Sequence, residues 1–148
     1  LEGECRHITS YLQIQQVRYQ DILTYDVDIP EEIANCKIPK ITLQPLVENA
    51  LYHGIKNKRG KGRIVVTGRR EKDKCVIRVE DNGIGMTKER LNQVRGGLTT
   101  KIEDSNDFYG LYNVNERIRL KFGEEYGLSI DSVLQEGTCV EVWLPWES

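Results

Sequence analysis

The hydrophobic positions at the start of the chain recur at helical spacing. Residues 1–23 contain no Pro, and no Gly after Gly3, and their apolar side chains recur in alternating steps of four and three. Such a repeat predicts a helix and is typical of helices that pack against partner helices. The positions are Leu1, Cys5, Ile8, Leu12, Gln15, Tyr19 and Ile22. Because this stretch is too short to decide, an amphipathic helix that lies on its own domain remains the alternative.

Short apolar runs bounded by turn residues predict five strands. The first run alternates polar and apolar residues and ends at Pro30, and the last run ends at Pro145. A polar turn at residues 71–74 joins the second and third runs, which predicts an antiparallel pair. The five runs cover residues 25–29, 64–67, 75–79, 128–133 and 138–144.

Helical spacing returns in three later segments. The first begins after Thr42, whose side chain is expected to cap it, and Pro45 is tolerated in its first turn. Its apolar face is made of Leu43, Leu46, Val47, Ala50, Leu51 and Gly54. A short helix capped by Thr87 is expected to reach about Val94. Residues 110–122 predict a longer helix.

Three stretches lack periodicity and are predicted as loops. Residues 30–40 lie between two prolines, and residues 56–63 form a basic stretch that contains Gly. Residues 95–108 are long for a structureless connection inside a compact domain, and such loops are often lids. The order of elements predicts the α+β class, as a two-layer α/β sandwich with a mixed, mostly antiparallel sheet and helices on one face.

Composition fits a single domain of 148 residues and argues against several classes of protein. Hydrophobic residues make up 39% and charged residues 30%, so the chain can build a core. A net charge of −2 argues against nucleic acid as a partner. No apolar run approaches the roughly 20 residues that span a bilayer, and no signal peptide is recognisable. Because the chain begins at Leu1 rather than Met, we expect a fragment of a longer protein.

The four cysteines are predicted to be structural. Cys5, Cys36, Cys75 and Cys139 are far apart in the sequence and form no C-x-x-C pair, which argues against a zinc site. A chain of this length can build a core without disulfides. We therefore expect small, mostly buried thiols in a reducing cytoplasm.

Three polar motifs follow one another along the predicted elements. The first, L-Q-P-L-V-E-N-A-L-Y-H-G at residues 43–54, places Asn49 opposite the apolar face of its helix. The second, D-N-G-I-G-M at residues 81–86, directly follows a strand. The third, Y-G-L-Y-N-V at residues 109–114, opens a helix, and a G-T pair precedes the last strand. Each motif is weak alone, since Asp, Asn and Gly are common in ordinary turns.

In this order, the motifs resemble those of the ATP-binding catalytic domain of sensor histidine kinases. The resemblance is greatest to the subfamily that regulates cell-wall autolysis, with its motif Q-P-L-V-E-N-A-x-x-H-G, and it covers nearly all of residues 8–146. DNA gyrase, Hsp90 and MutL belong to the same superfamily, so the resemblance implies a Bergerat-type ATP-binding fold. It implies a catalytic domain at residues 24–148, preceded at residues 1–23 by the end of a dimerisation-hairpin helix.

The resemblance implies an adenine site built on the second motif. Asp81 resembles the carboxylate that accepts a hydrogen bond from the exocyclic amino group of adenine. A carboxylate only accepts hydrogen bonds, so it disfavours the O6 atom of guanine. Gly83 and Gly85 are expected to let the nucleotide approach the backbone and to permit positive φ. Thr138 resembles the hydroxyl that supports the adenine contact, and Met86 belongs to the expected ATP contacts.

The resemblance implies a magnesium and phosphate site on the first and third motifs. Asn49 resembles the residue whose amide oxygen binds Mg²⁺, and Glu48 beside it is either structural or orients an outer-shell water. Backbone N–H groups at the start of the helix at residues 110–122 are expected to bind phosphate. The further expected ATP contacts are His53, Gly110, Leu111, Asn113, Lys56 and Lys101, with Arg95 as another candidate cation.

The chain departs from the family pattern at several positions. Hydrolytic members carry a general-base Glu where this chain has Pro45, which favours phosphoryl transfer over ATP hydrolysis. Tyr52 stands where many of these kinases have Lys, and Phe108 replaces the first Gly of the usual G-x-G-L motif. The resemblance also implies an acceptor His in an H-F-x-x-N setting, and neither His7 nor His53 has that setting.

The residues and the resemblance together predict the ATP-binding catalytic domain of a two-component sensor histidine kinase. Such a domain transfers the γ-phosphate of Mg-ATP to a His of the dimerisation domain, from which it passes to a response regulator. The resemblance implies a homodimeric full-length protein at the cytoplasmic face of the cell membrane, which it reaches only through absent N-terminal segments. A nucleotide-sensing scaffold without transfer is the alternative, and an ATPase of the gyrase or chaperone type is a third hypothesis.

Overall fold

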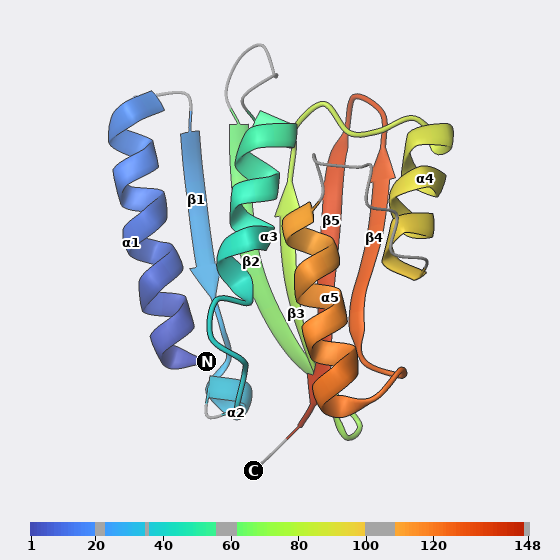
Figure 1. Cartoon of the computed structure of the whole chain (residues 1–148). Coiled ribbons are helices and arrows are strands. Elements are labelled where there is room, and N and C mark those ends of the chain that lie inside the picture. The colour runs from blue at the N-terminus through green and yellow to red at the C-terminus, as the bar shows by residue number, and fades with distance from the viewer. Residues whose placement is uncertain (20–22, 35, 56–61, 100–108, 147–148) are drawn as a thin grey trace.

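A sheet covered by a layer of helices makes up the structure (Figure 1). The computed structural model describes residues 1–19, 23–34, 36–55, 62–99 and 109–146. The elements in chain order are α1 (Glu2–Tyr19), β1 (Leu23–Asp28), α2 (Glu31–Ala34), α3 (Leu43–Asn49), the π-helix η2 (Ala50–Ile55), β2 (Gly62–Glu71), β3 (Lys74–Asp81), α4 (Lys88–Thr99), α5 (Tyr109–Phe122), β4 (Gly127–Val133) and β5 (Gly137–Pro145).

The strands form one sheet in the order β1-β2-β3-β5-β4. β1 and β2 are parallel, and every other pair of neighbours is antiparallel, which confirms the predicted mixed sheet. The register pairs Asp81 with Ile64 of β2 and with Thr138 of β5. The end of β3 therefore lies between the starts of β2 and β5, and the second motif meets the G-T pair.

The helices cover one face of the sheet, and the core lies between the two layers (Figure 1). Full burial of an aliphatic side chain stabilises the fold by about 1.5–3 kcal/mol before entropy costs. The buried strand residues include Ile64, Val66, Ile77, Val79, Val140 and Val142, and the helices contribute Leu46, Leu51, Leu111, Val114 and Ile118. The predicted two-layer sandwich is confirmed. Among the described helices, none has an apolar stretch long enough to cross a membrane.

Helix α1 lies along its own domain, against α3 and β1. Ile8 and Leu12 of its apolar repeat are fully buried there. Ile14 and Val17 point elsewhere and are 67% and 80% exposed. The repeat therefore serves the domain core, as the second interpretation of this helix expected, and association of α1 with partner helices stays a prediction.

Two expected loops are partly helical. Residues 30–40 contain the short helix α2. Helix α4 continues past Val94 to Thr99, so the expected lid loop does not begin at residue 95, and its residues 100–108 lie outside the described part of the chain. The sequence analysis ended this helix too early because α4 contains two glycines, and Gly has low helix propensity. The contact with α5 explains one of them, since a Cβ on Gly97 would lie 2.3 Å from Cζ of Tyr112.

Thr42 does not cap helix α3, contrary to the prediction. Its backbone is already helical, and its hydroxyl donates to the carbonyl oxygen of Pro39 at 2.6 Å. The N–H groups of Ile41 and Leu43 donate instead to the carboxylate of Glu4 on α1. A carboxylate at this place satisfies free N–H groups and meets the positive end of the helix dipole. A cap supplied by another helix leaves no signal in the local sequence.

The cysteines behave as small core or partly covered residues. All four are free thiols, and Cys36 and Cys75 are buried. Burial, reinforced by the neighbouring Cys36, raises the pKa of the Cys75 thiol to about 12. Burial also raises the pKa of Cys139 to about 11. These thiols stay protonated at neutral pH, so they are poor nucleophiles and metal ligands.

Candidate functional site

Asn49 stands where the first motif changes from an α-helix to a π-helix. Helix α3 ends at Asn49, and η2 begins at Ala50. The sequence predicted a regular helix here, and π-turns are rare and frequent at functional sites. The side-chain oxygen Oδ1 of Asn49 is buried and accepts no hydrogen bond from the described residues. Leaving such an oxygen unpaired costs roughly 1–3 kcal/mol, so this atom is a candidate ligand for a bound group.

Contacts from α5 fix the start of α3 and bring the first and third motifs together. The guanidinium of Arg117 donates to the carbonyl oxygens of Lys40 and Ile41, at 2.9 and 2.7 Å. Pro45 faces the start of α5, since a Cβ on Gly110 would lie 3.5 Å from the Cβ of Pro45. The position expected for a general base in hydrolytic relatives is therefore occupied by a ring packed against the third motif.

Glu48, beside Asn49, belongs to a chain of polar side chains. Gln44 Nε2 donates to Glu48 Oε1 at 2.8 Å, one helical turn away. Gln44 Oε1 in turn is hydrogen-bonded to Nε2 of His7 on α1. The Glu48 carboxylate is thus oriented from α1 through Gln44. This places His7 at a surface contact between two helices.

The second motif forms a tight turn at the end of β3. Asp81 is only 6% exposed, and its Oδ1 accepts the N–H of Gly83 at 2.8 Å. Gly85 has φ +67°, and a Cβ there would lie 2.0 Å from the carbonyl oxygen of Val133. Only glycine fits this conformation and this approach. The expected positive φ is confirmed at Gly85 and is wrong for Gly83.

Thr138 lies opposite Asp81 on the β3–β5 ladder. The two residues are register partners, and Thr138 is 8% exposed. Opposite residues on paired strands share a face, so the two polar side chains lie side by side. Gly137 makes this approach possible, because a Cβ there would lie 2.0 Å from the carbonyl oxygen of Asp81. The result is a pair of nearly buried oxygen-bearing side chains.

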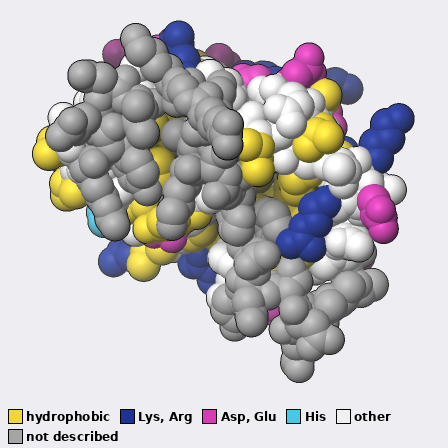
Figure 2. Space-filling model, turned by 90° about the horizontal axis from the view of Figure 1, so that it is seen from above, with side chains coloured by type: hydrophobic (Ala, Val, Ile, Leu, Met, Phe, Trp, Pro, Cys, Tyr) yellow, Lys and Arg dark blue, Asp and Glu magenta, His cyan; other side chains and the backbone are white. Residues whose placement is uncertain are grey.

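The helical segment that carries Asn49 leads to the end of the sheet where this pair lies. Helix η2 packs against β3 and β5, and the chain passes from η2 to the start of β2, where Ile64 pairs with Asp81 (Figure 1). In Figure 2, which looks onto this end, hydrophobic side chains of described residues reach the surface among Lys and Arg side chains. The segment that follows Asn49 therefore packs against the two strands that carry Asp81 and Thr138, and the joint use of these residues in one site stays a prediction.

Helix α5 supplies the third motif to this site mainly through its backbone. The side chain of Leu111 is buried in the core, whereas Gly110 and Asn113 are exposed. The first N–H groups of a helix have no partner within the helix. The first turn of α5 therefore offers donors beside Pro45, and their binding of phosphate stays a prediction.

Several expected contacts fall outside the described residues. Lys56 and Lys101 are among them, and the backbone of His53 lies in η2 while its side chain is not described. The parts that these three residues play in nucleotide binding stay predictions. Of the two departures from the family pattern, Phe108 also lies outside the described residues, and Tyr52 is 42% exposed.

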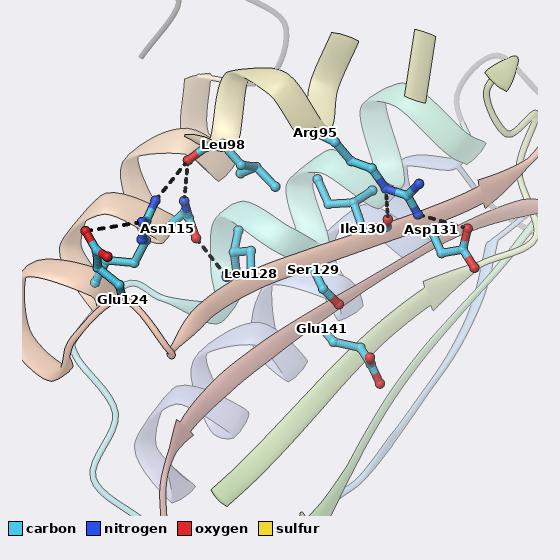
Figure 3. Close-up of a pocket in the computed structure, with 10 residues that line it drawn as sticks. Arg95, Leu98, Asn115, Glu124, Leu128, Ser129, Ile130, Asp131 and Glu141 are labelled. Carbon is cyan, nitrogen blue, oxygen red and sulfur yellow. Dashed lines mark hydrogen bonds and ion pairs between the residues drawn. The ribbon is translucent and has the colours of Figure 1, made fainter. Parts of the chain in front are cut away.

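A cavity of about 580 Å³ lies between α4, α5 and β4 (Figure 3). Several of the polar groups that line it are hydrogen-bonded to neighbouring residues of the cavity. Asn115 donates from Nδ2 to the carbonyl oxygen of Leu98 and accepts at Oδ1 the N–H of Leu128, both at 2.9 Å. The described residues that line it include none from the three motifs. The hydrogen bonds of its lining residues therefore hold the edge strand β4 against α4 and α5.

Arg95 lines this cavity, and its position differs from the one that the sequence analysis expected. Its Nε donates to the carbonyl oxygen of Ile130 at 2.9 Å, and its guanidinium also lies 3.4 Å from a carboxylate oxygen of Asp131 (Figure 3). It was a candidate cation for the phosphates. The structure directs it to the edge of β4 because α4 extends further than predicted and carries Arg95 along its length.

Ser132 on β4 is a site residue that the sequence analysis missed. The N–H of Met86, the last residue of the second motif, donates to Oγ of Ser132 at 2.8 Å. Nearby, the N–H of Gln135 donates to the carbonyl oxygen of Ile84 at 2.7 Å. A serine near a strand end carries no signal by itself, and this contact joins residues far apart in sequence.

Residues 39–148 match the family described as histidine kinase-, DNA gyrase B-, and HSP90-like ATPase. The chain is 32% identical over 146 residues, 99% of its length, to the sensor histidine kinase BtsS of Escherichia coli (strain K12), and covers 24% of that protein. It is 36% identical over 146 residues, 98% of its length, to the sensor histidine kinase YesM of Bacillus subtilis (strain 168), and covers 23% of it. The chain thus spans about a quarter of the length of these relatives.

The fold is also that of solved histidine kinase domains. The catalytic domain of histidine kinase ThkA aligns with a TM-score of 0.71 over 97% of this chain and 92% of that chain, at 12% identity. The histidine kinase domain of the blue-light activated kinase EL346 of Erythrobacter litoralis aligns with a TM-score of 0.64 over 98% of this chain and 60% of that chain, at 16% identity. At such identities the likeness shows the fold alone.

Proposed function

The chain belongs to the family of histidine kinase-, DNA gyrase B- and HSP90-like ATPases, and from this premise we propose that it is the ATP-binding catalytic domain of a two-component sensor histidine kinase. Relatives named as sensor histidine kinases match nearly the whole chain. The observation that supports the proposal is that η2, which directly follows Asn49, packs against β3 and β5, the strands that carry Asp81 and Thr138. The helical layer offers the amide oxygen of Asn49, and the sheet offers the hydrogen-bond acceptors of Asp81 and Thr138 for a nucleotide base.

Asp81 and Thr138 are proposed to hold the adenine. The Asp81 carboxylate accepts the N–H of Gly83. A carboxylate can accept several hydrogen bonds, which suits it to the exocyclic amino group as well. At Gly85 the turn carries no side chain, because the backbone of Val133 lies too close to leave room for one. A hydrogen bond between a buried carboxylate and a base amino group contributes about 1.5–3 kcal/mol. Adenine is favoured over guanine because guanine would place its O6 acceptor against the carboxylate.

Asn49 is proposed to bind Mg²⁺ together with the ATP phosphates. Its buried Oδ1 has no partner among the described residues, which fits a hard cation that prefers oxygen. Mg²⁺ takes few protein ligands and keeps phosphate oxygens and waters, so a single amide oxygen suffices. The metal, when bound, supplies charge neutralisation on the phosphates. Glu48, held by Gln44, is proposed to orient the neighbouring solvent.

The first turn of α5 is proposed to bind the phosphates. Its free N–H groups carry the positive end of the helix dipole, which favours an anion. The exposed backbone at Gly110 lies beside Pro45 on α3, the helix that carries Asn49. Lys56, Lys101 and His53 are proposed as further contacts on the grounds of the sequence motifs.

Transfer to a protein side chain, rather than hydrolysis, is the proposed reaction. An imidazole nitrogen of the acceptor His attacks the γ-phosphorus, the bond to the bridging oxygen breaks, and ADP leaves. This chain has to position the nucleotide and exclude water. Pro45 has no group that could take a proton from water, and it is packed against α5.

The partners follow from the proposed reaction. The acceptor His belongs to a dimerisation domain, of which α1 is proposed to be the last part, and the phosphate passes to a response regulator. We also propose that the full-length protein is a homodimer that works at the cytoplasmic side of the membrane, where ATP is available. Ile14 and Val17 on the exposed side of α1 are compatible with such an association.

A transfer assay tests this function. The chain is incubated with Mg²⁺ and ATP labelled at the γ-phosphate, alone and with the preceding dimerisation segment of its full-length protein. We expect label on a His of that segment, dependent on Mg²⁺, and no label on His7 of the chain alone. The Asn49→Ala variant should abolish labelling, and Asn92→Ala, an exposed position on α4, serves as the matched control.

The other outcomes contradict the proposal in distinct ways. ATP binding without any transfer would identify a nucleotide-sensing scaffold, the alternative suggested by Tyr52 and Phe108. Steady release of phosphate to solvent that depends on Asn49 would identify an ATPase. Label on His7 would show that the acceptor lies within this chain.

A further inference from the structure

We propose that Ser132 is a positioning residue that sets the base preference of the nucleotide site, an inference that rests on the proposed function. Ser132 lies near the end of β4 and is half-buried. Its Oγ lies 2.8 Å from the backbone N of Met86, 2.9 Å from the carbonyl oxygen of Gly137 and 2.9 Å from Oγ1 of Thr138. One hydroxyl therefore touches both the loop of the second motif and the side chain beside Asp81.

Counting protons assigns a direction to each of these hydrogen bonds. A serine hydroxyl has one proton to donate and two lone pairs to accept with. The N–H of Met86 can only donate, so it uses one lone pair. The carbonyl oxygen of Gly137 can only accept, so it receives the one proton. The remaining lone pair faces Thr138, whose hydroxyl therefore donates to Ser132.

This direction turns the Thr138 oxygen into an acceptor toward the pocket. With its proton held by Ser132, Oγ1 of Thr138 presents lone pairs beside the Asp81 carboxylate. Two neighbouring acceptors suit a ligand edge that donates, such as the amino group of adenine, directly or through one water. A purine with a keto group at that position meets two acceptors, which is unfavourable. Ser132 therefore adds to the selection that Asp81 makes.

The loop itself does not depend on Ser132 alone. Gln135 also holds it, through the N–H bond to the carbonyl oxygen of Ile84 at 2.7 Å. The close backbone contacts at Gly85 and Gly137 hold the same region. Removing the Ser132 hydroxyl should thus leave the second motif in place and release the Thr138 proton. The specific prediction is a change in base preference rather than a general loss of binding.

Calorimetry with two nucleotides tests this role. ATP and inosine triphosphate are suitable, because the second carries a keto group in place of the amino group. We expect Ser132→Ala to lower the ratio of ATP to inosine triphosphate affinity by about tenfold, the scale of one hydrogen bond. Ser132→Thr, which keeps the hydroxyl, should restore the ratio. Ser129→Ala is the matched control, because Ser129 lies on the same strand, exposed on the other face.

A double-mutant cycle isolates the hydroxyl pair. In a Thr138→Val background, Ser132→Ala should no longer change the affinity ratio, because there is no proton left to release. A change of undiminished size in that background would overturn the proposal, and so would an equal loss of affinity for both nucleotides in Ser132→Ala. Ser132→Cys, with a weaker donor of similar size, replaces the alanine variant if circular dichroism shows that the latter is unfolded.

Failure of this inference is distinguishable from failure of the proposed function. If the wild-type chain binds neither nucleotide, the proposed function is wrong and the role of Ser132 falls with it. If the wild-type chain binds ATP in a way that depends on Asp81, and Ser132→Ala keeps the wild-type affinity ratio, only the role of Ser132 is wrong.

Discussion

Two regions of the molecule treat their polar groups in opposite ways. Where α3 meets η2, Oδ1 of Asn49 is buried without a partner among the described residues. In the cavity beside β4, the amide of Asn115 is bonded at both of its ends, to Leu98 and to Leu128. The two side chains are of the same type and are both largely covered. The Asn49 oxygen can still accept a hydrogen bond or bind a ligand, whereas the Asn115 amide is already hydrogen-bonded within the fold.

This difference indicates that a cavity alone is weaker evidence of a binding site than a buried polar atom without a hydrogen-bond partner. Buried polar groups in folded proteins are nearly always hydrogen-bonded, so an exception asks for an explanation. The cavity beside β4 has room, but Arg95 and Asn115 are already engaged there. In the first motif, by contrast, Oδ1 of Asn49 has no partner among the described residues. Substitutions at both regions test this contrast.

The largest effect is expected in the cavity, on stability. Asn115→Ala leaves the N–H of Leu128 and the carbonyl oxygen of Leu98 without this partner, which should lower the free energy of unfolding by about 3 kcal/mol. Urea unfolding measures it, with Asn92→Ala, an exposed position on α4, as control within about 0.5 kcal/mol of wild type. A wild-type midpoint for Asn115→Ala would remove one side of the comparison.

The second largest effect is expected at Asp81, on the affinity for ATP. Asp81→Asn keeps the shape of the side chain but replaces an acceptor with a donor, so ATP affinity should fall roughly 10- to 100-fold. Calorimetry with ATP measures the change. Asp131→Asn, at the cavity, should leave ATP affinity unchanged. Equal affinity in wild type and Asp81→Asn would exclude the adenine contact.

Asn49→Ala should separate binding from stability. The substitution removes an unpaired oxygen, so the free energy of unfolding should stay level or rise by up to about 1 kcal/mol. ATP affinity in Mg²⁺ should fall about tenfold, to the value that wild type shows in a chelator. Thermal unfolding and calorimetry with and without Mg²⁺ measure the two quantities. A destabilised variant with normal Mg-ATP binding would show that the amide has a structural partner.

The smallest effect is expected in the core at alkaline pH. The folded pKa of Cys75 is raised from 9.0 to about 12, by burial and by Cys36. The unfolded thiol ionises first, so this contribution is complete below about pH 9 and is lost as the pH rises toward 12. Cys75→Ala should therefore lose less stability than wild type between about pH 8 and pH 10. Identical slopes in thermal unfolding would mean that Cys75 does not titrate between the states.

Much of the fold and of the candidate site could be predicted from the sequence. Short apolar runs bounded by turn residues predicted the strands, and the order of elements predicted the mixed sheet. Short motifs indicated those site features that depend on a residue's own backbone or on its place beside a strand. Gly85 has the positive φ that its motif suggested, and Asp81 ends strand β3.

Other features depend on residues that are distant in sequence. The cap of α3 comes from Glu4 on another helix, and the partner of Met86 is Ser132 on another strand. Arg95 was a candidate phosphate cation in a segment predicted as a loop, but it lies in α4, which packs on β4 and α5. Local patterns carry no information on such partners.

The layers, the order of elements and the short motifs follow from the sequence, since burial patterns and backbone constraints act over a few neighbouring residues. Which polar atoms find partners depends instead on how distant segments pack. That packing paired Asn115 and Arg95 within the cavity, left Oδ1 of Asn49 unpaired among the described residues, and set Ser132 beside Thr138. Hydrogen bonding depends on positions within a fraction of an ångström, and those are set only when distant segments pack together.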